Sequence, residues 1–439
     1  MVRLLHLSDI HFSKRSNTHY DLDQHVRDML LAELKEQLVH GAFTGCVITG
    51  DIGYSGAEIE YKAAFVFLTD LSRELGFPLG SIWIVPGNHD YDRKSAGDSI
   101  IVRDLVEKFR KIKEQEITKQ VEVYSTSLEH KEKLFSPLNA YVDFAKQFNC
   151  EISPEKSFWD IQIPLSDTPN IYLYIRGMNS CLISSFEDSH INDQTRMIMS
   201  LRQCQLGPKS DGVRMSLCHH PIKWLRNGSE LQTQLSNSFD IQLYGHEHTP
   251  RIDEFNDSVL IHAGAVHPER DEGAAMPSYN ILEFTVHPEE MNEVVKLNVV
   301  SRSYDFKNGR FITIEPRKGH GHRYSFRLPK QAALKQNVLA ATTPAYTAVA
   351  SAQNSQPAKL DEQLAIRTLQ VHFYTLSFYQ QLDILQKLGL SSEADSENLE
   401  KKRFGPFFQR AKDRNLLGEV WQKVSDKLSL NEKTVNPFR

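Results

Sequence analysis

The chain contains few cysteines, and their arrangement argues against two common kinds of site. There are five among 439 residues, and no two of them form a Cys-x-x-Cys pair. An odd count without close pairs is atypical of a disulfide framework or a thiolate zinc site. We therefore expect five buried, reduced thiols: Cys46, Cys150, Cys181, Cys204 and Cys218.

Long apolar runs and an excess of basic residues are also missing. The first apolar stretch, Leu4–Leu7, is too short for a signal peptide, and no run reaches the length of a membrane-spanning helix. The formal net charge is −5, whereas proteins that hold long nucleic acids by bulk charge are usually basic. We expect a cytoplasmic protein without a membrane segment, in which any nucleic-acid binding depends on a local patch or on bound metal.

Strand and helix patterns alternate through the first hundred residues. Short apolar runs end in polar segments, and apolar residues at helical spacing occupy 21–38 and 61–75. This order predicts an α/β domain with a largely parallel sheet, whose functional residues lie at strand ends. A mostly helical insertion at about 98–149 either caps the site or packs outside it. The closely spaced late strand patterns, up to residue 330, predict a second, mixed or antiparallel sheet packed on the first.

The composition changes after residue 330. Residues 331–360 are rich in Ala, Thr, Ser, Gln and Asn and almost lack charge, which is typical of a flexible linker. Residues 361–439 then carry apolar stripes at helical spacing, one of them around Leu385 and another around Trp421. We predict a catalytic domain at 1–330, a linker, and a small all-α module at 361–439.

Five polar segments each follow a predicted strand. They are Asp9-Ile10-His11, Gly50-Asp51, Gly87-Asn88-His89-Asp90, His219-His220-Pro221 and Gly245-His246-Glu247-His248. One such segment is common by chance, but five in this order are not. Carboxylate, imidazole and amide donors suit Mn, Fe, Zn or Ni rather than a soft thiolate site. The set predicts two divalent ions, with Mn favoured, that share a carboxylate and turn a bridging water into hydroxide at neutral pH.

The order D-x-H, GD, GNHD, HHP and GHxH resembles the calcineurin-like metallophosphoesterases over roughly residues 1–330. The resemblance implies a four-layer αββα fold with two central sheets. It also implies a role for each matching residue: one metal held by Asp9, His11 and His248, the other by Asn88, His219 and His246, Asp51 as the bridge, and His89 at the scissile phosphate, where it stabilises or protonates the leaving oxygen.

Two departures narrow the resemblance, and one choice stays open. The protein Ser/Thr phosphatases of this fold have a DRG sequence after the GD motif, which this chain lacks. Tyr54 has the spacing of a tyrosine ligand in purple acid phosphatases, but those enzymes lack a counterpart of His11, so we interpret Tyr54 as a packing or supporting residue. In the HHP segment the family pattern favours His219 as the ligand, and His220 either supports a ligand or is structural.

The layout most resembles the bacterial phosphodiesterase branch of the family. It implies hydrolysis of a phosphodiester bond in a nucleotide, cyclic nucleotide or nucleic acid. One alternative is a DNA or RNA nuclease whose partner protein supplies the nucleic-acid contacts. Another is an effector recruited through 361–439, a module that resembles the helical adaptor domains of bacterial conflict systems. The contrary interpretation of that module is a bundle that only packs on the catalytic domain.

Overall fold

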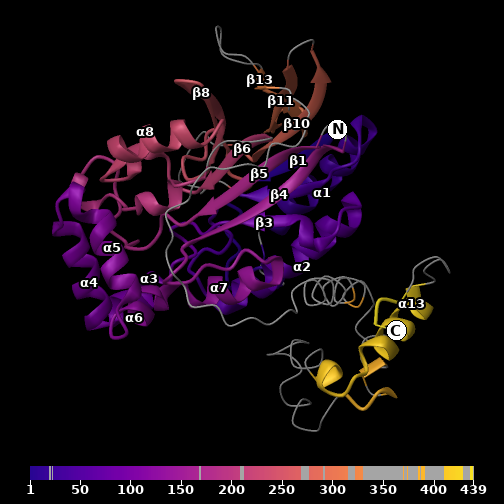
Figure 1. Cartoon of the computed structure of the whole chain (residues 1–439), viewed down its shortest axis with the longest axis horizontal. Coiled ribbons are helices and arrows are strands. Elements are labelled where there is room, and N and C mark those ends of the chain that lie inside the picture. The colour runs from indigo at the N-terminus through magenta and orange to yellow at the C-terminus, as the bar shows by residue number, and fades with distance from the viewer. Residues whose placement is uncertain are drawn as a thin grey trace, which may run out of the picture. The chain divides into compact units, whose positions relative to one another are not determined.

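A computed structural model gives the structure of the chain. It describes residues 1–18, 21, 23–167, 170–207, 212–267, 276–289, 292–314, 322–329, 369, 373, 384–385, 387–390, 410–428 and 436–438. The chain forms two compact units, Met1–Lys335 and Gln336–Arg439 (Figure 1). The predicted linker at 331–360 lies outside the described residues.

The first sheet starts with three parallel strands. β1 (Val2–Leu7), β2 (Gly45–Ile48) and β3 (Ile82–Ile84) lie side by side in that order. They are connected by α1 (Gln24–Glu36) and α2 (Glu58–Leu75), whose buried residues recur at helical spacing. The parallel start predicted from the alternating pattern is confirmed.

The last four strands of the unit extend this first sheet. They are β10 (Ser278–Pro288), β11 (Asn292–Asp305), β12 (Arg310–Thr313) and β13 (Arg323–Pro329). The strand order is β12-β11-β10-β1-β2-β3, with β13 also paired to β11, and β10 runs antiparallel to β1. Our prediction that the late strands build the second sheet is wrong for these four. Their pattern identifies a buried face but not the partner, and β10 covers the edge of β1 that would otherwise be unpaired.

The second sheet is built from the middle of the chain. Its order is β4-β5-β6-β7-β9-β8, with these bounds: β4 Phe158–Asp167, β5 Asn170–Met178, β6 Gly212–Cys218, β7 Ile241–Tyr244, β8 Arg251–Phe255 and β9 Ser258–His262. The central pairs are parallel and the two outer pairs antiparallel. A mixed second sheet was predicted, although no sequence pattern indicated β4 and β8.

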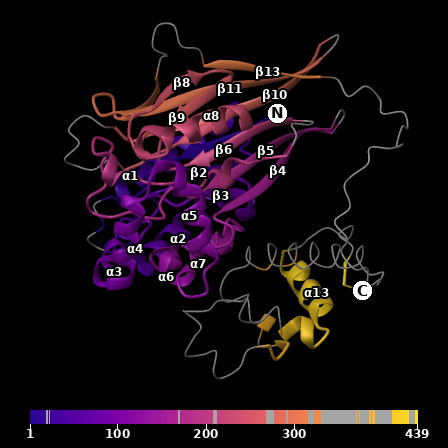
Figure 2. The same ribbon diagram turned by 60° about the vertical axis from the view of Figure 1, so that its left-hand side comes forward.

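The two sheets lie between layers of helices. Leu34 of α1 and Leu68 of α2 belong to the main apolar core with the first sheet. On the second sheet, α8 (Gly228–Ser238) buries Leu231 and Leu235 in a cluster with residues of β5, β6 and β7. Figures 1 and 2 show the helices on either side of the strands. This is the expected four-layer αββα arrangement.

The helical insertion packs into the main core. Its principal helices are α4 (Ile100–Lys111), α5 (Ile117–Thr126), α6 (Lys131–Phe135) and α7 (Asn139–Ala145), and α3 (Arg93–Asp98) precedes them. Their apolar side chains, including Phe109 and Phe144, are buried with the core of the first unit, and the ring of Phe144 stacks on that of Tyr61 at 4.9 Å. The insertion therefore follows the packing alternative.

The C-terminal unit has an apolar cluster of its own. Its best-defined helix, α13 (Leu417–Leu428), buries Leu417, Val420, Trp421 and Val424, as the predicted stripe requires. These side chains cluster with Leu369, Phe373, Ile384, Leu385, Leu390 and Ala411. Within the described residues of the whole chain, no helix is both long and apolar enough to cross a membrane.

Candidate metal centre

The five polar segments converge because each follows the end of a strand. Asp9 and Asp51 come after β1 and β2, Asn88 after β3, and His219 and His246 after β6 and β7. These strands are parallel within their sheets, so their carboxyl ends lie at the same edge. The fold therefore brings residues that are up to 239 positions apart into hydrogen-bonding distance.

Five of these residues adopt a backbone conformation that residues other than glycine usually avoid. The φ angles of Asp9, His11, Asp51, His246 and His248 lie between 52° and 71°, the left-handed region, which is costly for residues other than glycine. The backbone NH groups of positions 10 and 11 both donate to the carbonyl oxygen of Asp51, at 2.9 and 3.0 Å. Surrounding hydrogen bonds thus hold a conformation that turns the side chains toward a common centre.

The first half of the candidate centre contains Asp9, His11 and His248. Nε2 of His248 lies 3.1 Å from Oδ1 of Asp9. The His11 ring donates Nδ1–H to the carbonyl oxygen of His267 at 3.1 Å, which leaves Nε2 facing Oδ2 of Asp51 at 3.5 Å. Ligand atoms of the three side chains lie within 4.8 Å of one another, close enough to surround one cation.

The second half contains Asn88, His219 and His246. The His219 ring donates Nδ1–H to the carbonyl oxygen of Thr49 at 2.7 Å. Its Nε2 then lies 3.0 Å from Oδ1 of Asn88 and 3.3 Å from Oδ2 of Asp51. The buried Nε2 of His246 has no hydrogen-bond partner among the described residues. Oxygen and imidazole nitrogen atoms that converge on one point, one of them without a hydrogen-bond partner, are what a bound cation requires, so these residues fit a metal.

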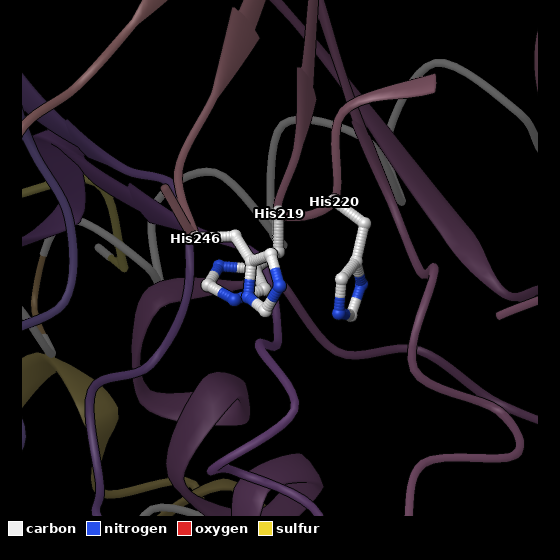
Figure 3. Close-up of side chains that lie close together, drawn as sticks. All are labelled: His219, His220 and His246. Carbon is white, nitrogen blue, oxygen red and sulfur yellow. The ribbon is translucent and has the colours of Figure 1, made fainter. Parts of the chain in front are cut away.

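His220 also reaches this second half. Its ring lies 4.6 Å from that of His246 and 4.8 Å from that of His219, centroid to centroid, and Figure 3 shows the three rings pointing the same way. Nδ1 of His220 is 2.8 Å from Oγ of Ser180. The sequence left open whether His220 supports a ligand, and this hydrogen bond to Ser180 gives the ring a fixed orientation beside two candidate ligands.

Asp51 faces both halves of the candidate centre. It shares one potential metal-binding group with His11 and His89 and another with Asp9 and His219. Its Oδ2 faces Nε2 of both His11 and His219, while Oδ1 accepts a hydrogen bond from the backbone NH of His89 at 2.7 Å. One carboxylate therefore joins the two halves.

The electrostatics of the cluster favour cations. Burial is the largest single influence on the pKa of Asp9 and raises it, but the charge and hydrogen bond of His248 together with the charge of His219 outweigh burial and lower the pKa to about 2. For His219, burial lowers the pKa, yet the charge and hydrogen bond of Asp51 together with the charge of Asp9 outweigh burial and raise the pKa to about 9. The carboxylates thus stay ionised, and protons on buried imidazoles balance them. Metal binding would replace those protons.

His89 lies at the edge of the cluster. Its Nδ1–H donates to the carbonyl oxygen of Tyr54 at 2.8 Å. Nη2 of Arg93 lies 2.9 Å from the same Nδ1 and 3.4 Å from Nε2. Burial lowers the pKa of His89. The Tyr54 ring, 46% exposed, packs 5.1 Å from the His89 ring and 6.0 Å from the His11 ring, in keeping with a packing role.

Comparison with known families matches most of this unit. The model of the calcineurin-like phosphoesterases matches residues 2–250 of the 439, a range that contains every candidate ligand. The chain belongs to the calcineurin-like phosphoesterase family. A second model, that of the GTPase-associated adaptor domain, matches residues 365–426. The predicted resemblances of both parts are confirmed.

Individual relatives of this calcineurin-like phosphoesterase are distant. An uncharacterized metallophosphoesterase-like protein of Bacillus subtilis, YydB, is 23% identical over 254 residues, or 56% of this chain and 49% of YydB, so the chain spans about half the length of that relative. Vps29 from Cryptosporidium parvum is 13% identical with a TM-score of 0.29, covering 74% of this chain and 98% of its own. A novel archaeal phosphodiesterase is 12% identical with a TM-score of 0.27, covering 71% and 99%.

A pocket of about 550 Å³ opens onto the metal centre of this calcineurin-like phosphoesterase. Asp51, Asn88, His89, His246 and His248 form part of its wall. The rest comes from residues that sequence reasoning did not assign to the site: His190, Lys223, Trp224, Glu247, Thr249 and Arg251. Only their position in the sequence indicated some of these residues, because Lys223 and Trp224 lie within three residues of Pro221 and Glu247 lies inside the GHEH segment. No described residue of the 98–149 insertion lines the pocket.

Proposed function

We propose that this calcineurin-like phosphoesterase hydrolyses a phosphodiester bond in a nucleotide, cyclic nucleotide or nucleic acid, with two divalent cations and Mn as the favoured metal. The observation that carries the proposal is the shared position of Asp51. Its carboxylate belongs to the potential metal-binding groups of both halves of the centre, and carboxylate sharing is the arrangement that a pair of adjacent divalent ions needs.

We assign the ligands as follows: one cation to Asp9, His11 and His248, the other to Asn88, His219 and His246, and Asp51 to both. Two divalent cations would supply an acidified water and positive charge for the phosphoryl oxygens. The chain prepares the ligands for this task. Because the carbonyl oxygens of His267 and Thr49 accept the Nδ1–H groups of His11 and His219, the Nε2 atoms present their lone pairs to the centre.

His89 is suited to the leaving oxygen. The carbonyl oxygen of Tyr54 holds its Nδ1–H, so Nε2 is the nitrogen that faces the pocket. The imidazolium form of His89, which the charge of Asp51 favours against the effect of burial, would pass its Nε2 proton to the leaving oxygen as the bond from that oxygen to phosphorus breaks. The guanidinium of Arg93 lies along the His89 ring, 2.9 Å from Nδ1 and 3.4 Å from Nε2, and would stabilise negative charge beside this ring.

A direct test uses a small chromogenic diester. Protein loaded with Mn should hydrolyse bis(p-nitrophenyl) phosphate, and Asp51→Asn should abolish the reaction. Asp143→Asn, a matched change of a side chain that is 75% exposed, should retain it. Full activity in Asp51→Asn would refute the mechanism. The same Mn-loaded protein, given cyclic nucleotides, labelled single-stranded DNA and labelled duplex DNA, separates a small-nucleotide phosphodiesterase from a nuclease.

We infer that the C-terminal unit recruits a partner, and that the partner is a GTPase or a GTPase-associated protein. The adaptor-domain match at 365–426 supports this, as does a separate apolar cluster around Trp421. A chain cut within 331–360 should keep diester hydrolysis in the N-terminal part and lose co-purification with a protein that hydrolyses GTP. If the N-terminal part alone still co-purifies with that activity, the adaptor role is refuted.

A further inference from the structure

Beside the metal centre, two rings form what we call the aromatic wall, made of Trp224 and His190. Their ring centroids lie 4.6 Å apart, and both side chains line the pocket. The Trp224 ring also meets the His246 ring edge-on, with centroids 3.9 Å apart and planes at 89°. The wall is therefore in direct contact with a candidate ligand, about one side chain away from where a phosphate would be held.

Trp224 is held in place by its own segment. Its carbonyl oxygen accepts a hydrogen bond from the backbone NH of Met197 at 2.9 Å, and the NH of Arg226 donates back to Met197 at 2.8 Å. The Arg226 guanidinium then donates to the carbonyl oxygens of Phe109 and Ile112, at 2.8 and 2.6 Å. These hydrogen bonds fix the backbone that carries the indole, and the indole itself packs against the His246 ring, so less conformational freedom is lost when a ligand packs on it.

The edge of the indole is already engaged, whereas His190 is exposed. Nε1 of Trp224 lies 3.4 Å from Oε1 of Glu247, so the indole donor is directed toward this carboxylate. His190 is exposed to solvent, which leaves ring surface available beside the indole. The wall thus offers ring faces, with the imidazole of His190 as its remaining polar edge, and the face of the indole suits a flat ring of any hydrogen-bonding pattern.

Positive charge accompanies these rings. Lys223, adjacent to Trp224 in sequence, is 55% exposed at its side chain and pairs with Glu247 at 2.5 Å. Glu247 also forms an ion pair with Arg251, and all three side chains line the pocket. An aromatic surface combined with cationic side chains is the usual way to bind an unpaired nucleotide without reading its sequence.

We propose that the aromatic wall of Trp224 and His190 is a nucleobase subsite, so that the substrate is a nucleotide ester whose base is unpaired. This inference rests on the proposed phosphodiester hydrolysis at the metal centre. A base within a duplex is stacked on both faces and cannot reach the wall without leaving the helix. A mononucleotide or a single strand presents a free face at no such cost.

Two chromogenic diesters with the same leaving group provide the test: thymidine 5′-(p-nitrophenyl phosphate) and methyl p-nitrophenyl phosphate. Stacking on an aromatic side chain is worth about 1–3 kcal/mol per base, which corresponds to about 5- to 150-fold. Mn-loaded protein should therefore prefer the thymidine ester in kcat/KM. Trp224→Leu should reduce the ratio of the two kcat/KM values by about that factor, and Trp224→Phe should retain most of it.

The controls separate stacking from support of the metal ligand. Phe306→Leu, a change of an aromatic residue that is 64% exposed and outside the pocket lining, should leave the ratio as it is, and metal content is measured in every variant. Equal loss on both esters in Trp224→Leu, or no preference in the unaltered protein, would overturn the subsite while the phosphodiesterase proposal stands. Failure to hydrolyse either ester would instead overturn the phosphodiesterase proposal itself.

Discussion

The two halves of the candidate metal centre differ in their charge. The half formed by Asp9, His11 and His248 has a carboxylate of its own, in addition to the shared Asp51. The half formed by Asn88, His219 and His246 contributes only neutral amide and imidazole donors, and His220 adds another imidazole beside it. Carboxylates suit harder cations and imidazoles suit borderline ones, so the halves should differ in which metal they prefer and how tightly they hold it.

The strongest way to break this comparison is to remove what the halves share. Asp51→Asn keeps the shape of the side chain but deletes the carboxylate whose Oδ2 lies 3.5 Å from Nε2 of His11 and 3.3 Å from Nε2 of His219. Loss of several kcal/mol of charge stabilisation predicts a fall in kcat/KM for bis(p-nitrophenyl) phosphate of about 10³-fold or more. Metal analysis should show that both ions are lost or weakened. A variant that loses only one ion would show that Asp51 belongs to one half.

A pair of single-ligand variants addresses the halves separately. His248→Ala removes a ligand from the carboxylate-containing half, and His246→Ala removes one from the imidazole-rich half. Each should lower kcat/KM by about a hundredfold and reduce the bound metal by one ion. Titration of Mn and Zn into each variant then measures the affinity of the remaining half for each metal.

The half left intact in His246→Ala is that of Asp9, His11 and His248. Because it contains a carboxylate of its own, its affinity for Mn relative to Zn should be higher than that of the other half. The half left intact in His248→Ala should favour Zn. Identical metal preferences in the two variants would show that the difference in donor chemistry has no effect on selectivity.

Much of this candidate centre is predictable from the sequence because its residues directly follow predicted strands. The segments at Asp9, Asp51, Asn88, His219 and His246 each combine a strand signal with a polar turn, and parallel strands bring such turns to one edge. The family resemblance then assigned the ligands. The geometry of the turns themselves was not predictable. Asp and His adopt a positive φ only occasionally, and at these positions tertiary hydrogen bonds impose it.

The features that the sequence did not predict, in the fold and in the pocket, depend on contacts between segments that are far apart in the chain. The pattern of β10 gives its buried face but not that it pairs with β1, because many strands share such a pattern. His190 and Trp224 lie 34 positions apart and carry no motif, so only the pairing of Met197 with Leu225 shows that they meet. Sequence patterns therefore identify the candidate metal ligands, whose residue types and positions after strands are distinctive. They miss residues such as His190 and Trp224, which come together only through long-range packing.

His220 gives a finer test of the imidazole-rich half. His220→Asn removes the ring that lies between Ser180 and the His246 ring. If His220 only orients the ligands, apparent metal affinity and kcat/KM should each fall by about 10- to 100-fold, and saturating metal should still give two bound ions. A stoichiometry of one ion at saturation would instead identify His220 as a ligand, which would make the imbalance between the two halves larger.

The smallest expected effect concerns His262, which packs on the segment that joins the two halves. Its Nδ1 lies 3.7 Å from Oε2 of Glu247, the residue between His246 and His248, and its side chain is 3% exposed. Burial, with the charge of Arg251 as the next cause, lowers the pKa of His262 from 6.5 to about 4. The folded protein therefore binds this proton more weakly than the unfolded chain does, which favours folding above pH 6.5.

That contribution should disappear as the pH falls from 6.5 through 4, and it amounts to at most about 3 kcal/mol. In urea unfolding of the metal-free protein, the unaltered chain should lose that much more stability between pH 7 and pH 4 than His262→Gln, which has no proton to gain. His25→Gln, a matched change at an exposed position, should follow the unaltered chain. If His262→Gln and the unaltered chain lose stability in parallel, folding does not shift the pKa of His262, and the folded protein takes up this proton as readily as the unfolded chain. The charge of His262 would then face Glu247 and draw that carboxylate away from Lys223 and Arg251, on the side of the pocket that both halves share.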